Sequence, residues 1–164
     1  MHTLYLLLGG NLGDKQAIFN QATGRLTEEL GTLLNTSSIF ETEPWGFEAD
    51  DLFWNQVLVI ETEKTPQGVL QITKSIENEL GRVRGEERYA SRTIDIDLLF
   101  YDDLCLEEDN LQLPHPRMIN RRFVLVPLYE IASDVVHPKF QKTIEQLLVE
   151  CEDKLQATAV EKYR

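Results

Sequence analysis

The segment TIDIDLLFY, residues 93–101, decides the fold that the sequence predicts. Its apolar residues alternate with two carboxylates, which is the two-residue period of a strand with one buried face. The apolar set consists of Ile94, Ile96, Leu98 and Phe100. Asp95 and Asp97 are therefore expected to project together from the opposite face of the strand.

The N-terminal part of the chain predicts a strand followed by a helix. Residues 3–9 form a short apolar run, and the glycine-rich turn GGNLGD then leads to Asp14, a typical helix cap. Apolar residues recur at helical spacing over residues 14–30, and Gly31 is a stop signal. The turn lacks the lysine of a P-loop and the spacing of GxGxxG, so a structural role is favoured over phosphate binding.

The middle of the chain predicts two strands and a second helix. Residues 37–43 and 53–63 have strand composition and are joined by a long connection, PWGFEADDL, of a length that is typical of a functional loop. Thr65 and Pro66 then provide a cap and a first-turn proline for a helix that ends at Gly81.

Together these segments have the order βαββαβ, which predicts an α/β (α+β) fold with a ferredoxin-like core: an antiparallel sheet with helices on its face. The core is expected over about residues 3–102. A C-terminal extension over residues 104–164 has weaker strand signals and predicts helices near residues 127–132 and 143–150. We expect residues 1–164 to form a single domain, in which the last dozen residues fray.

Composition and charge narrow the classes of function. The chain has 164 residues and a formal net charge of −12, which disfavours nucleic acid or an anionic membrane as the main partner. Cys105 and Cys151 lie far apart, so neither a disulfide framework nor a zinc site is indicated. The apolar run at residues 4–8 follows no basic region and is too short to span a bilayer. We expect a soluble, unprocessed, cytoplasmic monomer.

The positive charges of this acidic chain are concentrated in one region. Seven of the nine arginines lie between Arg82 and Arg122, and residues 82–92 contain four of them and no lysine. Planar guanidinium groups match phosphate oxygens in pairs, so the cluster indicates a compact anionic ligand. A solvated arginine-rich loop is an equally good interpretation of the cluster taken alone.

The arginine cluster leads directly into the strand that carries Asp95 and Asp97. Two neighbouring carboxylates disfavour each other's ionisation unless a cation lies beside them, and oxygen ligands suit magnesium. Taken alone, an Asp-x-Asp pair is more often an exposed acidic strand face. Beside arginines, it is the arrangement that phosphoryl transfer requires. The segment LPHPRMINRRF adds further cations and His115, which alone would more often be structural.

A second ligand is suggested by the long loop and the strand after it. Phe53 and Asn55 share a strand face, and Trp45 lies in the loop beside Gly46. Aromatic rings can sandwich a planar heterocycle, and a carboxamide can pair with its edge. Without other information, aromatic residues here are more often part of the core.

Five segments, LGGNLGD, ETEPWG, FWNQV, GRVRGEERYASRTIDIDLLFYDD and LPHPRMINRRFVLVPLYEIA, resemble the 6-hydroxymethyl-7,8-dihydropterin pyrophosphokinase family in order and spacing. The resemblance covers about residues 3–140. It implies a ferredoxin-like α/β fold and an enzyme of folate biosynthesis. The implied reaction transfers pyrophosphate from ATP to the hydroxymethyl group of the dihydropterin and gives AMP, with two Mg²⁺ ions as cofactors.

The resemblance also implies a role for individual residues. The implied magnesium ligands are Asp95 and Asp97, and the implied catalytic residues are Arg82, Arg92 and Asp97. The implied ATP-binding residues are Lys74, Glu77, Arg84, Arg92, Leu98, His115 and Arg121. The implied pterin-binding residues are Thr42, Pro44, Trp45, Gly46, Phe53, Asn55 and Phe123. Tyr89, Phe53 and Lys74 stand where other members have Trp, Tyr and Gln, which leaves details of affinity open.

Two other functions use some of the same features. An ATP hydrolase or a γ-phosphoryl kinase would employ the same carboxylates and arginines, but only diphosphate transfer yields AMP directly. A non-catalytic regulatory domain would have the same sheet, since such sheets often bind small effectors. It would not need paired aspartates beside arginines.

Overall fold

The computed structural model describes residues 1–43, 52–81 and 93–160. Its strands are β1 His2–Gly10, β2 Gly31–Thr36, β3 Phe40–Thr42, β4 Phe53–Thr62, β5 Asp95–Tyr101, β6 Leu106–Glu108, β7 Leu111–Leu113 and β8 Thr158–Ala159. Its helices are α1 Lys15–Leu30, α2 Pro66–Gly81, the 3₁₀ helix η1 Met118–Asn120, α3 Arg122–Ala132 and α4 Ile144–Glu150. No helix in these ranges is long and apolar enough to cross a membrane.

The chain folds into a mixed α/β structure around an antiparallel sheet. The sheet has the order β5-β1-β4-β3-β8, and β2 also pairs with β4. Every pairing in it is antiparallel. A separate two-stranded hairpin, β6-β7, follows β5. Because β1 and β4 lie at the centre, most of their residues are buried.

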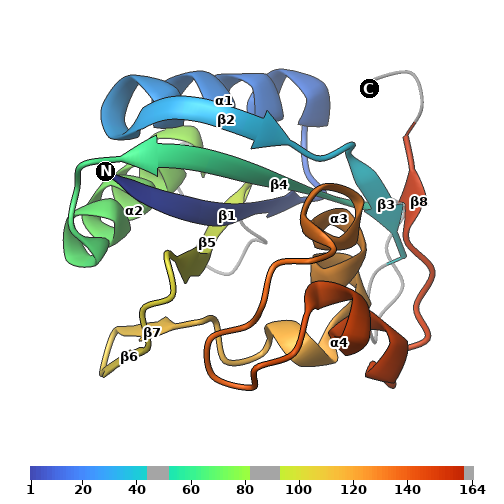
Figure 1. Ribbon diagram of the computed structural model, residues 1–164. Coiled ribbons are helices and arrows are strands. Elements are labelled where there is room, and N and C mark those ends of the chain that lie inside the picture. Colours follow the sequence, from blue (N-terminus) through green and yellow to red (C-terminus); the bar gives the residue numbers. More distant parts are fainter. Residues whose placement is uncertain (44–51, 82–92, 161–164) are drawn as a thin grey trace.

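Helices cover both faces of the sheet, and each face has its own hydrophobic cluster (Figure 1). On one face, α1 and α2 pack through residues such as Phe19 and Ile76. On the other face, α3 and α4 pack through residues such as Leu125 and Ile144. The C-terminal extension that the sequence predicts therefore forms the second layer of helices.

Local signals explain the boundaries of α1. The side chain of Asp14 accepts a hydrogen bond from the backbone N–H of Ala17 (3.2 Å), which caps the helix as predicted. Gly31 ends the helix with φ of 151°, and a Cβ there would lie 2.0 Å from the carbonyl oxygen of Glu61. Only glycine fits this position.

Three element boundaries differ from the prediction. The strand predicted over residues 37–43 is shorter in the structure, where only β3, Phe40–Thr42, lies in that range, and the unpredicted strand β2, Gly31–Thr36, precedes it. β5 begins at Asp95 rather than at residue 93. The helix predicted near residues 127–132 starts at Arg122, with Pro127 inside it. An internal proline costs about 3 kcal/mol, and burial of the apolar residues around it offsets that cost.

The prediction that Phe100 shares the buried face of Leu98 is wrong. In the pairing of β1 with β5, Tyr5 lies opposite Phe100, but the next residue, Leu6, lies opposite Leu98. Leu99 is thus an extra residue, a β-bulge, which interrupts the alternation. After the bulge, Phe100 packs in the α3–α4 cluster, while Leu98 packs in the α1–α2 cluster.

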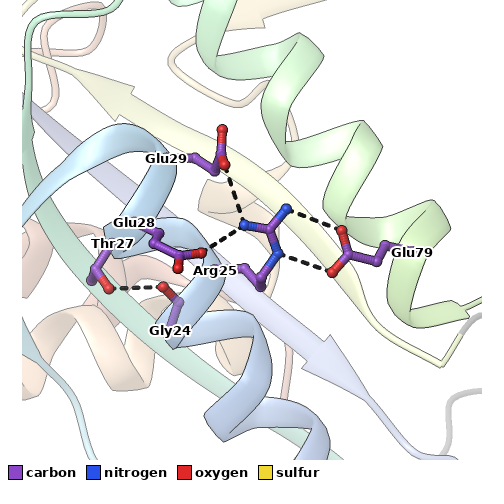
Figure 2. A network of polar contacts seen from close by, with 6 residues as sticks. All are labelled: Gly24, Arg25, Thr27, Glu28, Glu29 and Glu79. Carbon is purple, nitrogen blue, oxygen red and sulfur yellow. Dashed lines mark hydrogen bonds and ion pairs between the residues drawn. The ribbon is translucent and has the colours of Figure 1, made fainter.

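An ion-pair network joins α1 to α2 (Figure 2). The guanidinium of Arg25 donates two hydrogen bonds to Glu79 on α2, at 2.9 and 3.0 Å. It also contacts Glu28 and Glu29 on its own helix. Arg25 lowers the pKa of the Glu79 carboxyl through these hydrogen bonds. The carboxylates of these pairs are solvent-exposed, so we expect the pairs to contribute little to stability.

Candidate active site

Two cavities meet where β1, β4 and β5 come together at one end of the sheet. The first has a volume of about 210 Å³. The second has a volume of about 380 Å³ and lies between α2, β5 and the β6-β7 hairpin. Asp95 and Asp97 line both cavities. The two carboxylates therefore point the same way, as the strand period predicts, and stand at the boundary between the cavities.

The floor of the first cavity is a row of residues across three strands. Gly9 of β1 lies opposite Asn55 of β4 on one side and opposite Asp95 of β5 on the other. A Cβ at Gly9 would lie only 2.9 Å from the Oδ1 atom of Asn55. The glycine therefore leaves open the space between the carboxamide and the carboxylate.

Aromatic side chains from two elements line the first cavity. Phe53 comes from the start of β4 and Phe123 from the first turn of α3, and both are half-buried. The guanidinium carbon of Arg121 lies 5.5 Å from the centre of the Phe123 ring, within the range of a cation–π interaction. Thr42, buried on β3, completes this group. Such walls suit a flat, polar-edged ring.

Asn55 supplies the polar contact in this apolar setting. Its side chain is buried, and its carboxamide hydrogen-bonds to none of the residues that the structure describes. A carboxamide that lines a cavity keeps its N–H donors and its carbonyl acceptor available to a ligand that enters. The carboxamide is therefore placed to pair with the edge of a heterocycle in the cavity.

The second cavity is lined mainly by polar and charged side chains. Lys74 and Glu77 project into it from α2, one helical turn apart, and Leu98 lines it from β5. The backbone N–H of Ile96 donates a hydrogen bond to the Glu77 carboxylate at 2.6 Å. Because Ile96 lies between the two aspartates, this bond fixes the strand segment that carries them.

His115 lines the second cavity as a neutral ring. Its backbone N–H donates to the carbonyl of Leu99, and its Nδ1 accepts a hydrogen bond from the N–H of Arg117. Burial lowers the pKa of His115, as do Arg121 and Arg117, while Asp97 opposes the shift. With Nδ1 accepting, the proton of the neutral ring is on Nε2. His115 can therefore donate a hydrogen bond to a phosphate oxygen.

The described candidates for the pterin line one cavity, and most of the described candidates for ATP line the other. The first cavity contains all four described pterin candidates, Thr42, Phe53, Asn55 and Phe123. The second contains four ATP candidates, Lys74, Glu77, Leu98 and His115. Arg121, predicted for ATP, lines the first cavity instead. Pro44, Trp45, Gly46, Arg82, Arg84 and Arg92 lie outside the described residues.

Several residues that line the cavities were not predicted from the sequence. In the first cavity these are Leu7, Gly9, Glu43 and Leu155. In the second they include Asp109, Asn110 and Gln112 of the β6-β7 hairpin. The strand period of β1 would have indicated Leu7 and Gly9, because they alternate toward the same face. No local pattern marks Leu155, which is 32 residues after Phe123 in the sequence.

The donor set at Asp95 and Asp97 fits magnesium bound together with a phosphate ligand. Within residues 1–43, 52–81 and 93–160, no three His, Cys, Asp or Glu side chains form a metal cluster. Magnesium is commonly held by one or two carboxylates, with phosphate oxygens and water as its other ligands. Two aspartates at the boundary of a polar cavity meet that requirement.

Comparison with protein families and curated proteins gives one consistent match. Residues 5–133 match the family model of 7,8-dihydro-6-hydroxymethylpterin-pyrophosphokinase (HPPK). The chain is 42% identical over 142 residues to the 2-amino-4-hydroxy-6-hydroxymethyldihydropteridine pyrophosphokinase of Porphyromonas gingivalis, covering 85% of this chain and 96% of that protein. It is 42% identical over 132 residues to the Bacillus subtilis protein of that name, covering 80% and 78%.

Solved structures give the same fold. The HPPK-DHPS structure of Plasmodium falciparum, wild type with SDX-DHP, superposes with a TM-score of 0.69 at 20% sequence identity. The superposition covers 92% of this chain and 43% of that chain. This chain therefore spans less than half of the solved protein, and the likeness concerns the fold.

Proposed function

The chain belongs to the 7,8-dihydro-6-hydroxymethylpterin-pyrophosphokinase family, and from that membership and the two cavities we propose how its residues act. The enzyme transfers pyrophosphate from ATP to the hydroxymethyl group of 6-hydroxymethyl-7,8-dihydropterin in folate biosynthesis, and AMP is released. The observation that carries the proposal is the meeting of an aromatic cavity and a polar cavity at two carboxylates.

We assign the first cavity to the pterin. Phe53 and Phe123 lie where they can stack on its ring system, and the Asn55 carboxamide lies where it can pair with the ring edge. Thr42 adds a further polar contact. The hydroxymethyl group of the ring then points toward Asp95 and Asp97, since these residues close the cavity on the side of the second one.

We assign the second cavity to ATP. Lys74 and the Nε2–H of His115 provide donors for phosphate oxygens, and Leu98 provides apolar surface beside the nucleotide. Glu77 holds the backbone between the two aspartates. Arg121 lies over the Phe123 ring at the boundary, where it can contact both substrates. Arg82, Arg84 and Arg92 remain predicted contributors to phosphate binding and transfer.

Formation of AMP fixes which bond changes. The pterin hydroxyl oxygen forms a bond to the β phosphorus, and the bond between that phosphorus and the oxygen that bridges it to the α phosphate breaks. The hydroxyl proton leaves during the transfer, and either the Asp97 carboxylate or a water molecule accepts it. Two magnesium ions held by Asp95 and Asp97 would neutralise the charge on the phosphate oxygens and acidify the hydroxyl. The residues of both cavities keep the two substrates aligned and exclude water.

Further features of the protein are proposed with this function. The pairing order β5-β1-β4-β2, with α1 and α2 on one face, supports a ferredoxin-like core over residues 3–102. We further propose that residues 1–164 form a single domain and that the enzyme acts as a cytoplasmic monomer without a nucleic-acid partner.

Product analysis tests the proposed function. Purified protein is incubated with ATP and magnesium, with and without 6-hydroxymethyl-7,8-dihydropterin, and the nucleotides are separated by chromatography. We expect AMP only when all three compounds are present. ADP formation at a comparable rate without the pterin would contradict the proposal, because it would indicate hydrolysis or γ-phosphoryl transfer.

A further inference from the structure

The C-terminal residues after α4 form an extended segment that returns to the first cavity. Between Cys151 and Ala159, half-buried residues alternate with exposed ones. This is the period of an extended chain with one face against the protein. Figure 1 shows the segment running from the end of α4 to β8, which lies beside β3. The segment lies outside residues 5–133, which match the family model.

The segment is fixed to the protein at both ends. Cys151 packs against the α3–α4 cluster, and Val160 packs against the α1–α2 cluster on the other face of the sheet. β8 pairs with β3 through Phe40 and Ala159, and the N–H of Val160 donates to the carbonyl of Ile39 at 2.8 Å. The middle of the segment is therefore held across the end of the sheet.

Asp153 joins this segment to α3. One carboxylate oxygen accepts a hydrogen bond from the N–H of Arg122 at 3.0 Å, and the other accepts one from the N–H of Leu155 at 3.0 Å. The first N–H groups of a helix have no partner within the helix, and Arg121 at the cap position offers none from its side chain. A single carboxylate thus positions both the start of α3, which carries Phe123, and Leu155.

Leu155 faces the first cavity. It is half-buried, and within the described residues it belongs to neither hydrophobic cluster, although the ends of its segment do. Its side chain lines the cavity together with Phe53, Phe123 and Asn55. Apolar surface that contributes little to the core but faces a ligand cavity is available to cover a ligand.

We propose that Leu155 contacts the bound pterin as a wall of its site, and that Asp153 positions this wall relative to Phe123. The inference rests on the proposed function, because it assumes that the first cavity holds the pterin. It adds a substrate-contacting residue from the C-terminal segment, and it predicts that this residue acts on the pterin and leaves ATP binding unchanged.

Calorimetric titration of the full-length protein tests the proposal. The pterin is titrated in the presence of magnesium and a non-hydrolysable ATP analogue, and the analogue is titrated separately. For Leu155→Ala we expect roughly tenfold weaker pterin binding, because apolar surface is no longer removed from water. Analogue binding should be unchanged, and Leu155→Ile should restore most of the affinity. Gln156→Ala, an exposed neighbour, is the matched control and should behave as the unmodified protein.

The possible outcomes separate the two proposals. If the unmodified protein binds the analogue but not the pterin, the proposed function fails and the inference fails with it. If it binds the pterin and Leu155→Ala binds it equally well, the inference alone is overturned. If Leu155→Ala lowers the affinities for the pterin and for the analogue by the same factor, and also lowers the melting temperature, the inference is again overturned, because Leu155 would then be structural. For Asp153→Ala we likewise expect weaker pterin binding and unchanged analogue binding. If the affinities for both ligands fall by the same factor, Asp153 does not have the proposed positioning role.

Discussion

The two cavities of this protein are built by different means. The first is formed by β1 and β5, the ends of β3 and β4, the start of α3 and the C-terminal segment, and aromatic and aliphatic side chains cover most of its wall. The second is formed by one face of α2, by β5 and by a hairpin, and it presents ammonium, carboxylate, amide and imidazole groups. A ring is recognised by enclosure and stacking, whereas a triphosphate is recognised by charge and hydrogen-bond donors. The two aspartates belong to both regions.

The largest effect is expected at the shared boundary. Asp97→Asn keeps the shape of the side chain but removes a charge that the magnesium–phosphate complex needs. We expect turnover to fall by about 10²–10³ or more, as when one stabilising group of a transition state is removed. Steady-state AMP formation measures the effect, and Asp95→Asn should behave similarly. Near-normal turnover in both variants would remove the metal role of these residues.

The next largest effect should be confined to the first cavity. Phe123→Ala removes a ring that stacks on the pterin, and stacking on an aromatic side chain contributes about 1–3 kcal/mol per base in nucleic-acid complexes. Pterin affinity should fall by the corresponding factor, while affinity for an ATP analogue stays unchanged. Tyr129→Ala, an exposed aromatic residue on the same helix, is the control for calorimetry. If Phe123→Ala lowers the affinities for both ligands by the same factor, the assignment of the two cavities to different ligands is contradicted.

The opposite selectivity is expected in the second cavity. Lys74→Ala removes an exposed cation from α2, and exposed charge pairs contribute about 0.2–1 kcal/mol. The Michaelis constant for ATP should therefore rise about 1.5- to 5-fold, with that for the pterin unchanged. Lys64→Ala, an exposed lysine that lines neither cavity, controls for the change in net charge. If only the Michaelis constant for the pterin changes, the assignment of this cavity to ATP is contradicted.

A smaller effect on stability is expected outside both cavities, at His137. This ring is buried, and its Nδ1 accepts hydrogen bonds from the N–H groups of Lys139 and Phe140. Burial, with Lys139, lowers the pKa of His137. A lowered pKa means that the neutral ring stabilises the fold above the usual pKa of histidine, and that this contribution is lost as the pH falls through the folded-state pKa.

Melting curves of the unmodified protein and of His137→Gln test this linkage. At pH 7.5 the variant should melt at a lower temperature, and the difference between the two proteins should narrow as the pH is reduced to 5. Ligand affinities at pH 7.5 should be equal in the two proteins. A difference that widens toward pH 5 would mean that the sign of the linkage is wrong.

The smallest effect is expected at the network between α1 and α2 in Figure 2. Arg25→Ala removes the bonds to Glu79, Glu28 and Glu29, all of which are exposed. The melting temperature should fall slightly at low salt and hardly at all in 1 M NaCl, because salt screens exposed charges. A large loss that persists in high salt would show that the network contributes more than exposed pairs usually do.

The sequence predicted the features that depend on short-range pattern and missed those that depend on distant packing. The strand period placed Asp95 and Asp97 on one face, and capping signals placed the start of α1 at Asp14. The bulge at Leu99 was not predictable, because it arises from the register with β1. At the early start of α3, the N–H of Arg122 is paired with Asp153, which comes from a segment far along the chain.

The same distinction holds for the candidate site. Phe53 and Asn55 share a strand face, so their nearness follows from the sequence. The roles of Phe123 and His115 were predicted only from the resemblance to a family. These residues lie far in the sequence from Phe53 and Asn55, so no local pattern indicates where they lie in the fold. Neither source indicated Leu155, because an alternating segment of small, charged and apolar residues near a chain end resembles a frayed terminus. The predicted roles of Arg82 and Arg92 remain predictions.

The short strand β8 has a consequence for association between molecules. β3 would otherwise form an edge of the sheet, with unpaired backbone groups that could template pairing with another copy of the chain. β8 occupies that edge, and with only two residues it offers little edge of its own. A short edge strand of this kind is a common protection against aggregation. Loss of the C-terminal residues would therefore threaten colloidal stability at high protein concentration, in addition to any effect on the pterin.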